Sequence, residues 1–379
     1  MTIHIVASGD TVNSIAAAYQ IPADTIIYNN QLIYPYILVV GQALLLSTPS
    51  ELQPYRFVVT NGYAYPFINN WVLTQTLPYL SRLSVFSYGF STEGEIIPPT
   101  LDDSFMIQAT LEYSSAPFLT LTPFDASGRF NNNLISAVIN NPSVKNTLID
   151  NLVITVSEKG FQGVDIDFEY ILAEDRIAFA DFVRDVRIAI NQLGYPVTVA
   201  LAPKTSDNQP GLLYEGKDYA LLGEAADEVL LMTYEWGYTY SEPMAVAPIN
   251  NVRRVVEYAL TRIPHEKINL GIPNYGYDWP LPYEKGVTRA TTIGNIEAIT
   301  IAANNGAEIQ FDETAMSPFF TYTNNEIAHE VWFEDVRSMQ TKFNLVEEYD
   351  LHGMGYWQIM RLFRANWLLL ADRFLIDKP

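Results

Sequence analysis

From residue 55 onward, the sequence alternates between short apolar segments and longer amphipathic ones. The strand-like segments cover residues 57–63, 82–90, 118–123, 163–169, 197–203, 228–234, 268–274 and 353–358. Helical periodicity lies between them, for example over residues 132–140, 144–159, 173–193 and 252–263. Eight strand–helix units in about 320 residues predict an α/β fold, a TIM (β/α)8 barrel. The first strand lacks a following glycine-rich nucleotide loop, which argues against a doubly wound open sheet.

The amino-acid composition excludes several classes of ligand and partner. The chain has 22 basic and 43 acidic residues, a net charge of −21, which disfavours binding to nucleic acid or anionic membranes. It has no cysteine and four scattered histidines, so we expect no metal and no cofactor. No apolar run reaches membrane-spanning length and no signal peptide is seen at the N-terminus. The oligomeric state cannot be inferred from these features.

The predicted fourth strand carries three acids at every second position, Asp165, Asp167 and Glu169. Side chains alternate along a strand, so the three carboxylates share one face. Their mutual repulsion should raise at least one pKa, and a protonated carboxyl beside an ionised one is the chemistry of glycoside cleavage. In a TIM barrel the C-terminal strand ends form the active site, which places Glu169 at the mouth. A calcium site or an acidic barrel interior is the alternative.

The first 48 residues form a separate unit with the pattern β-α-α-β. Residues 3–6 alternate as a strand, two helices follow over about residues 12–19 and 22–30, and a strand is expected over 38–46. The unit resembles the LysM module, through Gly9-Asp10-Thr11, Ile15-Ala16, Tyr19, Asn29 or Asn30, Leu32, Leu38 and Gly41-Gln42-Ala43-Leu44. Residues 49–54, rich in polar residues and proline, then read as a linker.

The LysM resemblance implies binding of glycans that contain N-acetylglucosamine, in peptidoglycan or chitin. The groove would lie between the loop after the first strand and the loop after the second helix. Its candidate contacts are Gly9, Asp10, Thr11, Asn30 and Leu32. Alternatively, Gly9, Asp10 and Thr11 only build a turn and a helix cap. A single module would bind weakly.

Residues 55–379 resemble glycoside hydrolase family 18, which carries D-G-x-D-x-D-x-E on its fourth strand. This chain has Gln162-Gly163-Val164-Asp165-Ile166-Asp167-Phe168-Glu169, so only the outermost Asp is replaced. The resemblance implies a retaining hydrolase in which Glu169 donates the proton and the substrate's acetamido oxygen is the nucleophile. Asp167 would orient the acetamide and share a proton with Asp165, and Tyr234 would hydrogen-bond the acetamido oxygen.

Two weaker motifs agree with this family. Residues 231–236 resemble its M-x-Y-D, with Met232 and Tyr234 matching and Glu235 where Asp is usual. Trp357, on the eighth strand, resembles the tryptophan that forms the floor of the sugar site. Asn274 and Tyr275, at the end of the seventh strand, complete the expected substrate contacts. The family's S-x-G-G after strand three is not evident near residues 121–125, which indicates a divergent branch.

Between strands seven and eight lie about 75 residues, too many for a plain crossover. We expect an inserted α+β lobe at about residues 280–330, with a helix over 290–305 and short strands over 308–312 and 319–323. Residues 329–349 then read as the helix that leads into strand eight.

The combination of LysM and family 18 motifs is similar to the spore cortex-lytic N-acetylglucosaminidases, although those usually carry two LysM copies. It implies cleavage of N-acetylglucosamine linkages in peptidoglycan and a spore or cell-wall location. A chitinase acting on chitin oligomers is the first alternative. A catalytically silent, lectin-like wall or spore-coat protein is the second.

Overall fold

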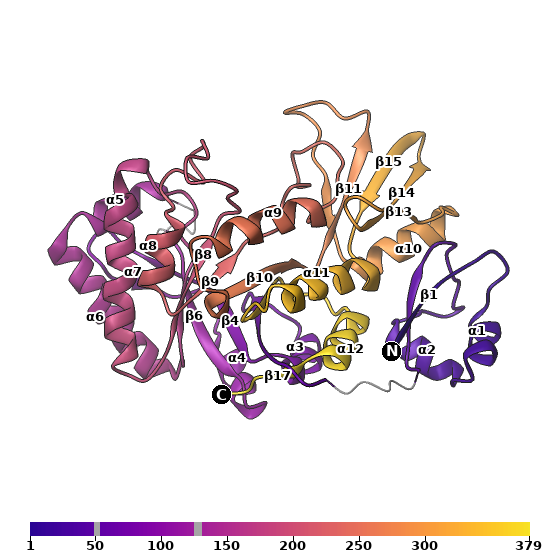
Figure 1. The fold of residues 1–379 in the computed structure, drawn as a ribbon, viewed down its shortest axis with the longest axis horizontal. Coiled ribbons are helices and arrows are strands. Elements are labelled where there is room, and N and C mark those ends of the chain that lie inside the picture. Colours follow the sequence, from indigo (N-terminus) through magenta and orange to yellow (C-terminus); the bar gives the residue numbers. More distant parts are fainter. Residues whose placement is uncertain (49–53, 125–130) are drawn as a thin grey trace.

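The computed structural model describes residues 1–48, 54–124 and 131–379. The linker predicted at residues 49–54 lies outside the described residues, except for Pro54. Figure 1 shows a barrel with helices packed around it, an upright β-rich lobe above one side, and a small N-terminal unit next to that lobe. Among the described residues, no helix is long and apolar enough to cross a membrane.

Eight parallel strands form the barrel, and pairing of the first with the second closes it. In order around the barrel they are β3 (Phe57–Ala64), β4 (Arg82–Phe90), β6 (Ala116–Leu121), β7 (Val164–Ile166), β8 (Val197–Leu201), β9 (Glu228–Leu231), β10 (Ile268–Pro273) and β16 (Gly353–Trp357). These are the eight predicted strands in the predicted order, so the TIM-barrel prediction is confirmed. Several are shorter than expected at their C-terminal ends, because the chain leaves the sheet as it reaches the mouth.

Helices surround the barrel on its outer side (Figure 1). They are α3 (Asn70–Thr76), α4 (Ser104–Glu112), α5 (Asn132–Ile139), α6 (Pro142–Lys159), α7 (Arg176–Asn191), α8 (Tyr219–Ala225), α9 (Ile249–Leu260), α11 (Val336–Glu348) and α12 (Arg364–Arg373). In α6, the Asn141 side chain caps the first turn, Pro142 occupies a position that needs no N–H donor, and Gly160 ends the helix at φ 81°.

Short elements complete the barrel. Two edge strands, β5 (Ile96–Ile97) and β17 (Leu375–Ile376), pair with β4 and β3. Single turns of 3-10 helix occur at η1 (Leu77–Tyr79), η2 (Ala173–Asp175) and η3 (His265–Lys267). The predicted helix over 173–193 is therefore η2 followed by α7.

The lobe between β10 and β16 contains one antiparallel sheet and one helix. The sheet order is β12 (Thr291–Ile293), β11 (Gly276–Leu281), β15 (Ile327–Trp332), β14 (Ser317–Asn324) and β13 (Gln310–Asp312), with α10 (Asn295–Asn305) beside it. The prediction of one helix over 329–349 was wrong in its first part. Residues 327–332 pair with both β11 and β14, and the helix begins only after Asp335, whose carboxylate accepts from the N–H groups of Arg337 and Ser338.

The N-terminal unit has the predicted βααβ order. Strands β1 (Thr2–Ile5) and β2 (Ala43–Leu46) pair antiparallel, and α1 (Val12–Tyr19) and α2 (Ala23–Asn29) pack against them. The closing strand begins at Ala43 rather than residue 38, because the chain turns through Gly41 at φ 84°.

The N-terminal unit is docked onto the rest of the molecule. Leu45 belongs to the barrel core, and Val39 packs with the apolar cluster of the inserted lobe. The Ile309 N–H donates to the Val40 carbonyl at 2.9 Å, and Arg337 donates to the Gly41 carbonyl at 3.2 Å. The unit is therefore held by backbone contacts as well as by apolar packing.

Candidate active site

The carboxylates of β7 lie at the mouth of the barrel. Regular pairing ends at Ile166, yet the Asp167 N–H still donates to the Leu121 carbonyl at 2.9 Å, so the alternation of side chains continues. Phe168 points the other way and stacks on Phe179 and Phe182 of α7. An apolar anchor between two acids thus fixes the direction of both.

Asp165 is the deepest of the three acids and is fully buried. Its Oδ1 accepts a 2.5 Å hydrogen bond from Thr198 on the adjacent strand β8. Its Oδ2 has no hydrogen-bond partner among the described residues, nor has the buried Tyr63 hydroxyl. Burial raises the pKa of Asp165 to about 6, against the opposing effects of the Thr198 hydrogen bond and the Arg82 charge.

Asp167 and Glu169 lie one and two steps nearer the solvent. Burial raises the pKa of Asp167 well above its ordinary value, and the charges of Glu169 and Asp165 raise it further. Burial also raises the pKa of Glu169. The cation of Lys217 lowers the pKa of both. The pair therefore favours a state with one shared proton, as expected from the three-acid strand.

A cavity of about 600 Å³ opens over these two acids. Carboxylates, aromatic side chains and two aliphatic ones line it: Asp167, Glu169, Tyr170, Leu213, Tyr214, Met232, Tyr234, Glu235, Tyr238, Tyr277 and Trp357. Six of the expected residues therefore meet here, from β7, from the chain after β9 and from β16. Burial raises the pKa of Tyr234 well above its usual range, and the negative charges of Asp167 and Glu169 raise it further. The Tyr234 hydroxyl therefore keeps its proton and can donate a hydrogen bond.

Glu235 is held by two tyrosines from the segment that enters the inserted lobe. Its Oε1 accepts from the Tyr275 hydroxyl at 2.5 Å and from the Tyr277 hydroxyl at 2.9 Å. The residue reaches the surface, but its carboxylate is turned inward, where burial raises its pKa despite both hydrogen bonds. Its backbone has φ 65°, a left-handed conformation uncommon for a residue with a side chain.

Trp357 forms an aromatic floor at the end of β16. Its ring lies 4.9 Å from Phe86, 5.7 Å from Tyr63 and 6.1 Å from Tyr65, measured between centroids. Next to this cluster, a second hollow of about 230 Å³ is lined by Tyr65, Phe67 and Phe86 among others. Aromatic surface therefore continues from the cavity along one side of the barrel mouth.

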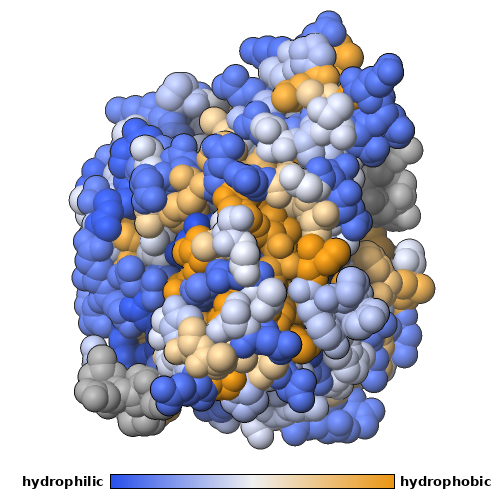
Figure 2. Space-filling model, turned by 90° about the vertical axis from the view of Figure 1, so that its right-hand side faces the viewer, coloured by the Kyte–Doolittle hydropathy of each residue, from blue (hydrophilic) through white to orange (hydrophobic). Residues whose placement is uncertain are grey.

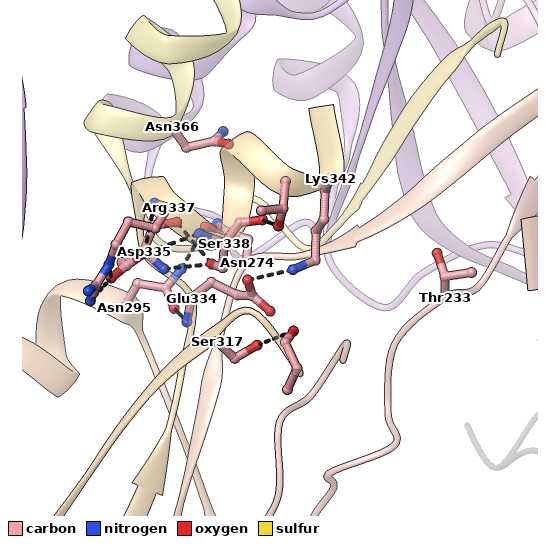
Figure 3. Close-up of polar contacts among 12 residues, drawn as sticks. Thr233, Asn274, Asn295, Ser317, Glu334, Asp335, Arg337, Ser338, Lys342 and Asn366 are labelled. Carbon is pink, nitrogen blue, oxygen red and sulfur yellow. Dashed lines mark hydrogen bonds and ion pairs between the residues drawn. The ribbon is translucent and has the colours of Figure 1, made fainter. Parts of the chain in front are cut away.

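Asn274 does not line the cavity. It is buried, and its amide donates to the carbonyls of Gln358 and Arg361 at 3.0 Å each. Figure 3 shows it in a polar cluster with Asn295 and Glu334, beneath the inserted lobe. Its contacts hold the chain that follows β16. Tyr275 is also buried and reaches the cavity only through Glu235.

Sequence reasoning missed several residues of this site. Thr198 could have been found, because it lies opposite Asp165 in the register of β7 and β8. Lys217 and Tyr214 come from the irregular chain between β8 and α8, where no periodicity points to them. Tyr277 lies on β11, a strand that was not predicted.

In the N-terminal unit, two of the expected glycan contacts are engaged internally. Asp10 accepts from the Ala7 N–H at 2.7 Å and lies 3.0 Å from His4. Asn30 is buried and bonded to the backbone of Leu45 and Ile26.

The other three expected contacts have different surroundings. Thr11 caps α1 in a box with Ser14, and Gly9 has φ 90° with open space around it. Leu32 lines a hollow of about 170 Å³ between the loop after α2 and helix α10. Ile33 and Ile37 in that loop are 68% and 60% exposed, and Figure 2, which shows this face, has apolar surface gathered at its centre.

The described residues contain no group of three His, Asp or Glu side chains arranged to hold a metal ion. The segment near residues 121–125, where S-x-G-G was not evident, runs into residues outside those described.

Comparison with known proteins gives two family matches. The model of glycosyl hydrolases family 18 matches residues 127–361, and that of the LysM domain matches residues 4–47. The cortical fragment-lytic enzyme of Bacillus subtilis (strain 168) is 36% identical over 430 residues, covering 100% of this chain and 99% of the relative. The enzyme of the same name from Bacillus anthracis is 34% identical, covering 98% of each.

A solved structure is similar over the same length. The spore cortex-lytic enzyme SleL of Bacillus cereus superposes with a TM-score of 0.94 at 32% identity, covering 100% of this chain and 99% of that one. The similarity therefore includes both the barrel and the N-terminal unit.

Proposed function

This chain belongs to glycosyl hydrolases family 18, and we propose that it cleaves N-acetylglucosamine linkages in the peptidoglycan of the bacterial spore cortex. The observation that carries the proposal is the cavity over Asp167 and Glu169, in a chain similar along its whole length to cortex-lytic enzymes. The net charge of −21 fits a glycan with few negative charges.

Glu169 acts as the proton donor in this proposal. A glycosidic oxygen is a poor leaving group until it is protonated, and burial raises the pKa of Glu169, which favours the protonated form that can donate to this oxygen. As the C–O bond breaks, the substrate's acetamido oxygen attacks the anomeric carbon and forms an oxazolinium ion. Glu169, now ionised, takes a proton from a water molecule, and the water oxygen attacks the anomeric carbon. This opens the oxazolinium ring and leaves the anomeric carbon with its original configuration. This substrate-assisted route needs no carboxylate nucleophile.

The two deeper acids support the acetamido group. Asp167 orients its N–H and stabilises the positive oxazolinium, and Asp165 exchanges a proton with Asp167 from below. The Tyr234 hydroxyl donates to the acetamido oxygen. What supports these roles is that all four side chains converge at the barrel mouth, with three raised carboxyl pKa values and a tyrosine that keeps its proton.

The remaining site residues bind the sugar or support those that do. The apolar face of a pyranose ring would stack on Trp357, and Met232 and Glu235 would contact the same sugar from the opposite side. Tyr275 orients the Glu235 carboxylate, and Asn274 holds the chain after Trp357 in place.

We further propose that residues 1–48 are a glycan-binding module and residues 55–379 the catalytic barrel, with an insertion at about 280–330. The LysM match supports a module that holds the enzyme on peptidoglycan, and hence a spore or cell-wall location. Gly9, Thr11 and Leu32 remain candidate glycan contacts, whereas Asp10 and Asn30 are proposed to shape the groove from within.

The test compares wild type with Glu169→Gln on purified cortex fragments and on chitin oligomers, with mass analysis of the products. We expect wild type to release products ending in N-acetylglucosamine from cortex fragments and the variant to bind without turnover. Glu174→Gln, the same change at an exposed acid in η2 that does not line the cavity, is the matched control and should retain activity. Turnover by Glu169→Gln would contradict the catalytic assignment. Faster cleavage of chitin oligomers than of cortex fragments would contradict the proposal that cortex peptidoglycan is the substrate.

A further inference from the structure

A lysine lies buried behind the carboxylate pair, although none of the proposed catalytic steps uses it. Lys217 is fully buried, and its Nζ donates to the Ala200 carbonyl at 3.1 Å. Ala200 lies on β8, one residue beyond the partner of Ile166 in the β7–β8 register, and is therefore beside Asp167. The ammonium is thus held at a carbonyl of the barrel wall, beside Asp167.

The backbone around Lys217 is fixed at several points. A Cβ on Gly216 would lie 2.2 Å from the Ile171 carbonyl oxygen, so residue 216 must be glycine for the chain to pass this close to the segment after Glu169. The Lys217 carbonyl accepts from Lys204 Nζ at 2.7 Å. The side chain therefore enters the protein from a backbone that cannot shift away from the acids.

A buried ammonium is costly unless negative charge lies near it. Among the described residues, no carboxylate forms a direct ion pair with Lys217, so its charge acts on Asp167 and Glu169 through space and not through a contact. Burial lowers the pKa of Lys217 to about 8, and Asp167 and Glu169 oppose that shift. In return, its cation lowers the pKa of both acids. Other ionisable groups that interact with the pair are Asp165, Glu235, Tyr63, Tyr65, Tyr170 and Tyr234.

We propose that Lys217 is a positioning residue whose buried positive charge keeps one proton, rather than two, on Asp167 and Glu169 at neutral pH. Burial favours protonation of both carboxyls. Their mutual repulsion disappears once one of them is protonated, so a nearby positive charge is what favours ionisation of the other. The reaction needs Asp167 ionised to stabilise the oxazolinium while Glu169 holds the proton to be donated. The inference rests on the proposed hydrolytic function.

The first test is the pH profile of kcat/KM on a soluble chromogenic N-acetylglucosamine oligomer for wild type, Lys217→Met and Lys217→Arg. We expect both limbs of the Lys217→Met profile to move up by about one pH unit, because loss of a nearby opposite charge raises both carboxyl pKa values. Lys217→Arg should keep the wild-type limbs even if its rate falls. Lys267→Met, which removes a lysine whose Nζ also donates to backbone carbonyls but which lies directly before β10, at the end of that strand away from the mouth, should leave the limbs unmoved. A lower rate with unmoved limbs in Lys217→Met would overturn the proposal.

The second test does not depend on catalysis or on the folding of a Lys217 variant. The Lys217 side chain is titrated by carbon NMR in wild type and in Asp167→Asn, using protein labelled at the lysine Cε. Loss of the Asp167 charge should lower the titration midpoint of Lys217 by about one pH unit. An unchanged midpoint would refute the coupling, even if the enzyme hydrolyses peptidoglycan as proposed. A shifted midpoint in a protein without hydrolase activity would support the coupling and refute the proposed function alone.

Discussion

Thr198 Oγ1 donates a 2.5 Å hydrogen bond to Asp165 Oδ1, and in the described structure this is the bond that the deepest carboxylate of the site receives. The two residues are opposite each other in the register of β7 and β8. Thr120 lies opposite Asp165 on the other side, on β6, but its buried hydroxyl has no hydrogen-bond partner in the described part of the chain. Asp165 therefore lies between two threonines, of which Thr198 donates a hydrogen bond to it and Thr120 does not.

This asymmetry predicts different effects of removing the two hydroxyls. Thr198→Val should raise the pKa of Asp165 above its value of about 6, because the hydrogen bond favours the ionised form. A bond to a charged group contributes about 1.5–3 kcal/mol, so we expect kcat/KM at pH 7 to fall roughly tenfold or more. Thr120→Val is the matched control and should change kcat/KM little. Equal effects in a steady-state assay would contradict the assigned role of Thr198.

The raised pKa of Asp165 predicts that stability falls as pH rises. Its folded value of about 6 exceeds the ordinary 3.8, so the folded state binds the proton more tightly than the unfolded state. This contribution is complete below pH 3.8 and is lost as pH rises through 6. At 1.36 kcal/mol per pKa unit, a difference of 2.2 units corresponds to about 3 kcal/mol.

Asp165→Asn should therefore unfold with a free energy up to about 3 kcal/mol higher than wild type at pH 7, with the gain vanishing near pH 3.5. Urea unfolding at both pH values measures the difference. A stability gain independent of pH, or a loss at pH 7, would show that the carboxylate is not strained by burial.

We predict that Asn30 stabilises the fold of the N-terminal unit and does not contact the glycan. Its side chain makes three hydrogen bonds to backbone atoms of Ile26 and Leu45. Asn30→Ala removes the side-chain partner of the Leu45 N–H and carbonyl, whereas the Ile26 carbonyl keeps its bond from the N–H of residue 30, and we expect a cost of about 3 kcal/mol. Asn29→Ala, which loses one bond to Ser47, should cost about 1 kcal/mol. Thermal unfolding gives both costs. Weaker glycan binding by Asn30→Ala with unchanged stability would instead make Asn30 a contact residue.

The sequence predicted the parts of the molecule that depend on local pattern. All eight barrel strands followed from short apolar runs, and the acids of β7 followed from alternation along one strand. Strand ends were predicted too long, as at 163–169, because an extended chain continues beyond its last pairing. Pairing between distant segments was the harder part. Residues 327–332 have no strand signal of their own, and β11 and β14 on either side make them a strand.

The site residues also fall into those that the sequence predicted and those that only the folded structure reveals. Met232, Tyr234, Glu235 and Trp357 were predicted because they resemble family 18 motifs at the ends of the predicted sixth and eighth strands. Lys217 comes from a loop, and only the folded structure brings its charge to Asp167 and Glu169. Asn274 shows the reverse error, since a polar residue at a strand end holds a backbone segment instead of lining the cavity.

The buried ion pair beneath the inserted lobe yields the last prediction. Lys342 Nζ lies 2.8 Å from Glu334 Oε2, and both side chains are 1% exposed (Figure 3). The other carboxylate oxygen of Glu334 has no partner among the described residues, and burial raises the pKa of this acid against the effect of Lys342. Lys342→Met therefore leaves a buried, unpaired acid, which should destabilise the fold by about 3–5 kcal/mol at pH 7. The loss should shrink as pH falls, because Glu334 then takes up a proton.

The double variant Glu334→Leu, Lys342→Met should recover most of the stability, and urea unfolding of the full double-mutant cycle measures the coupling. If the two single costs simply add in the double variant, the pair contributes no coupling and each side chain acts through packing alone.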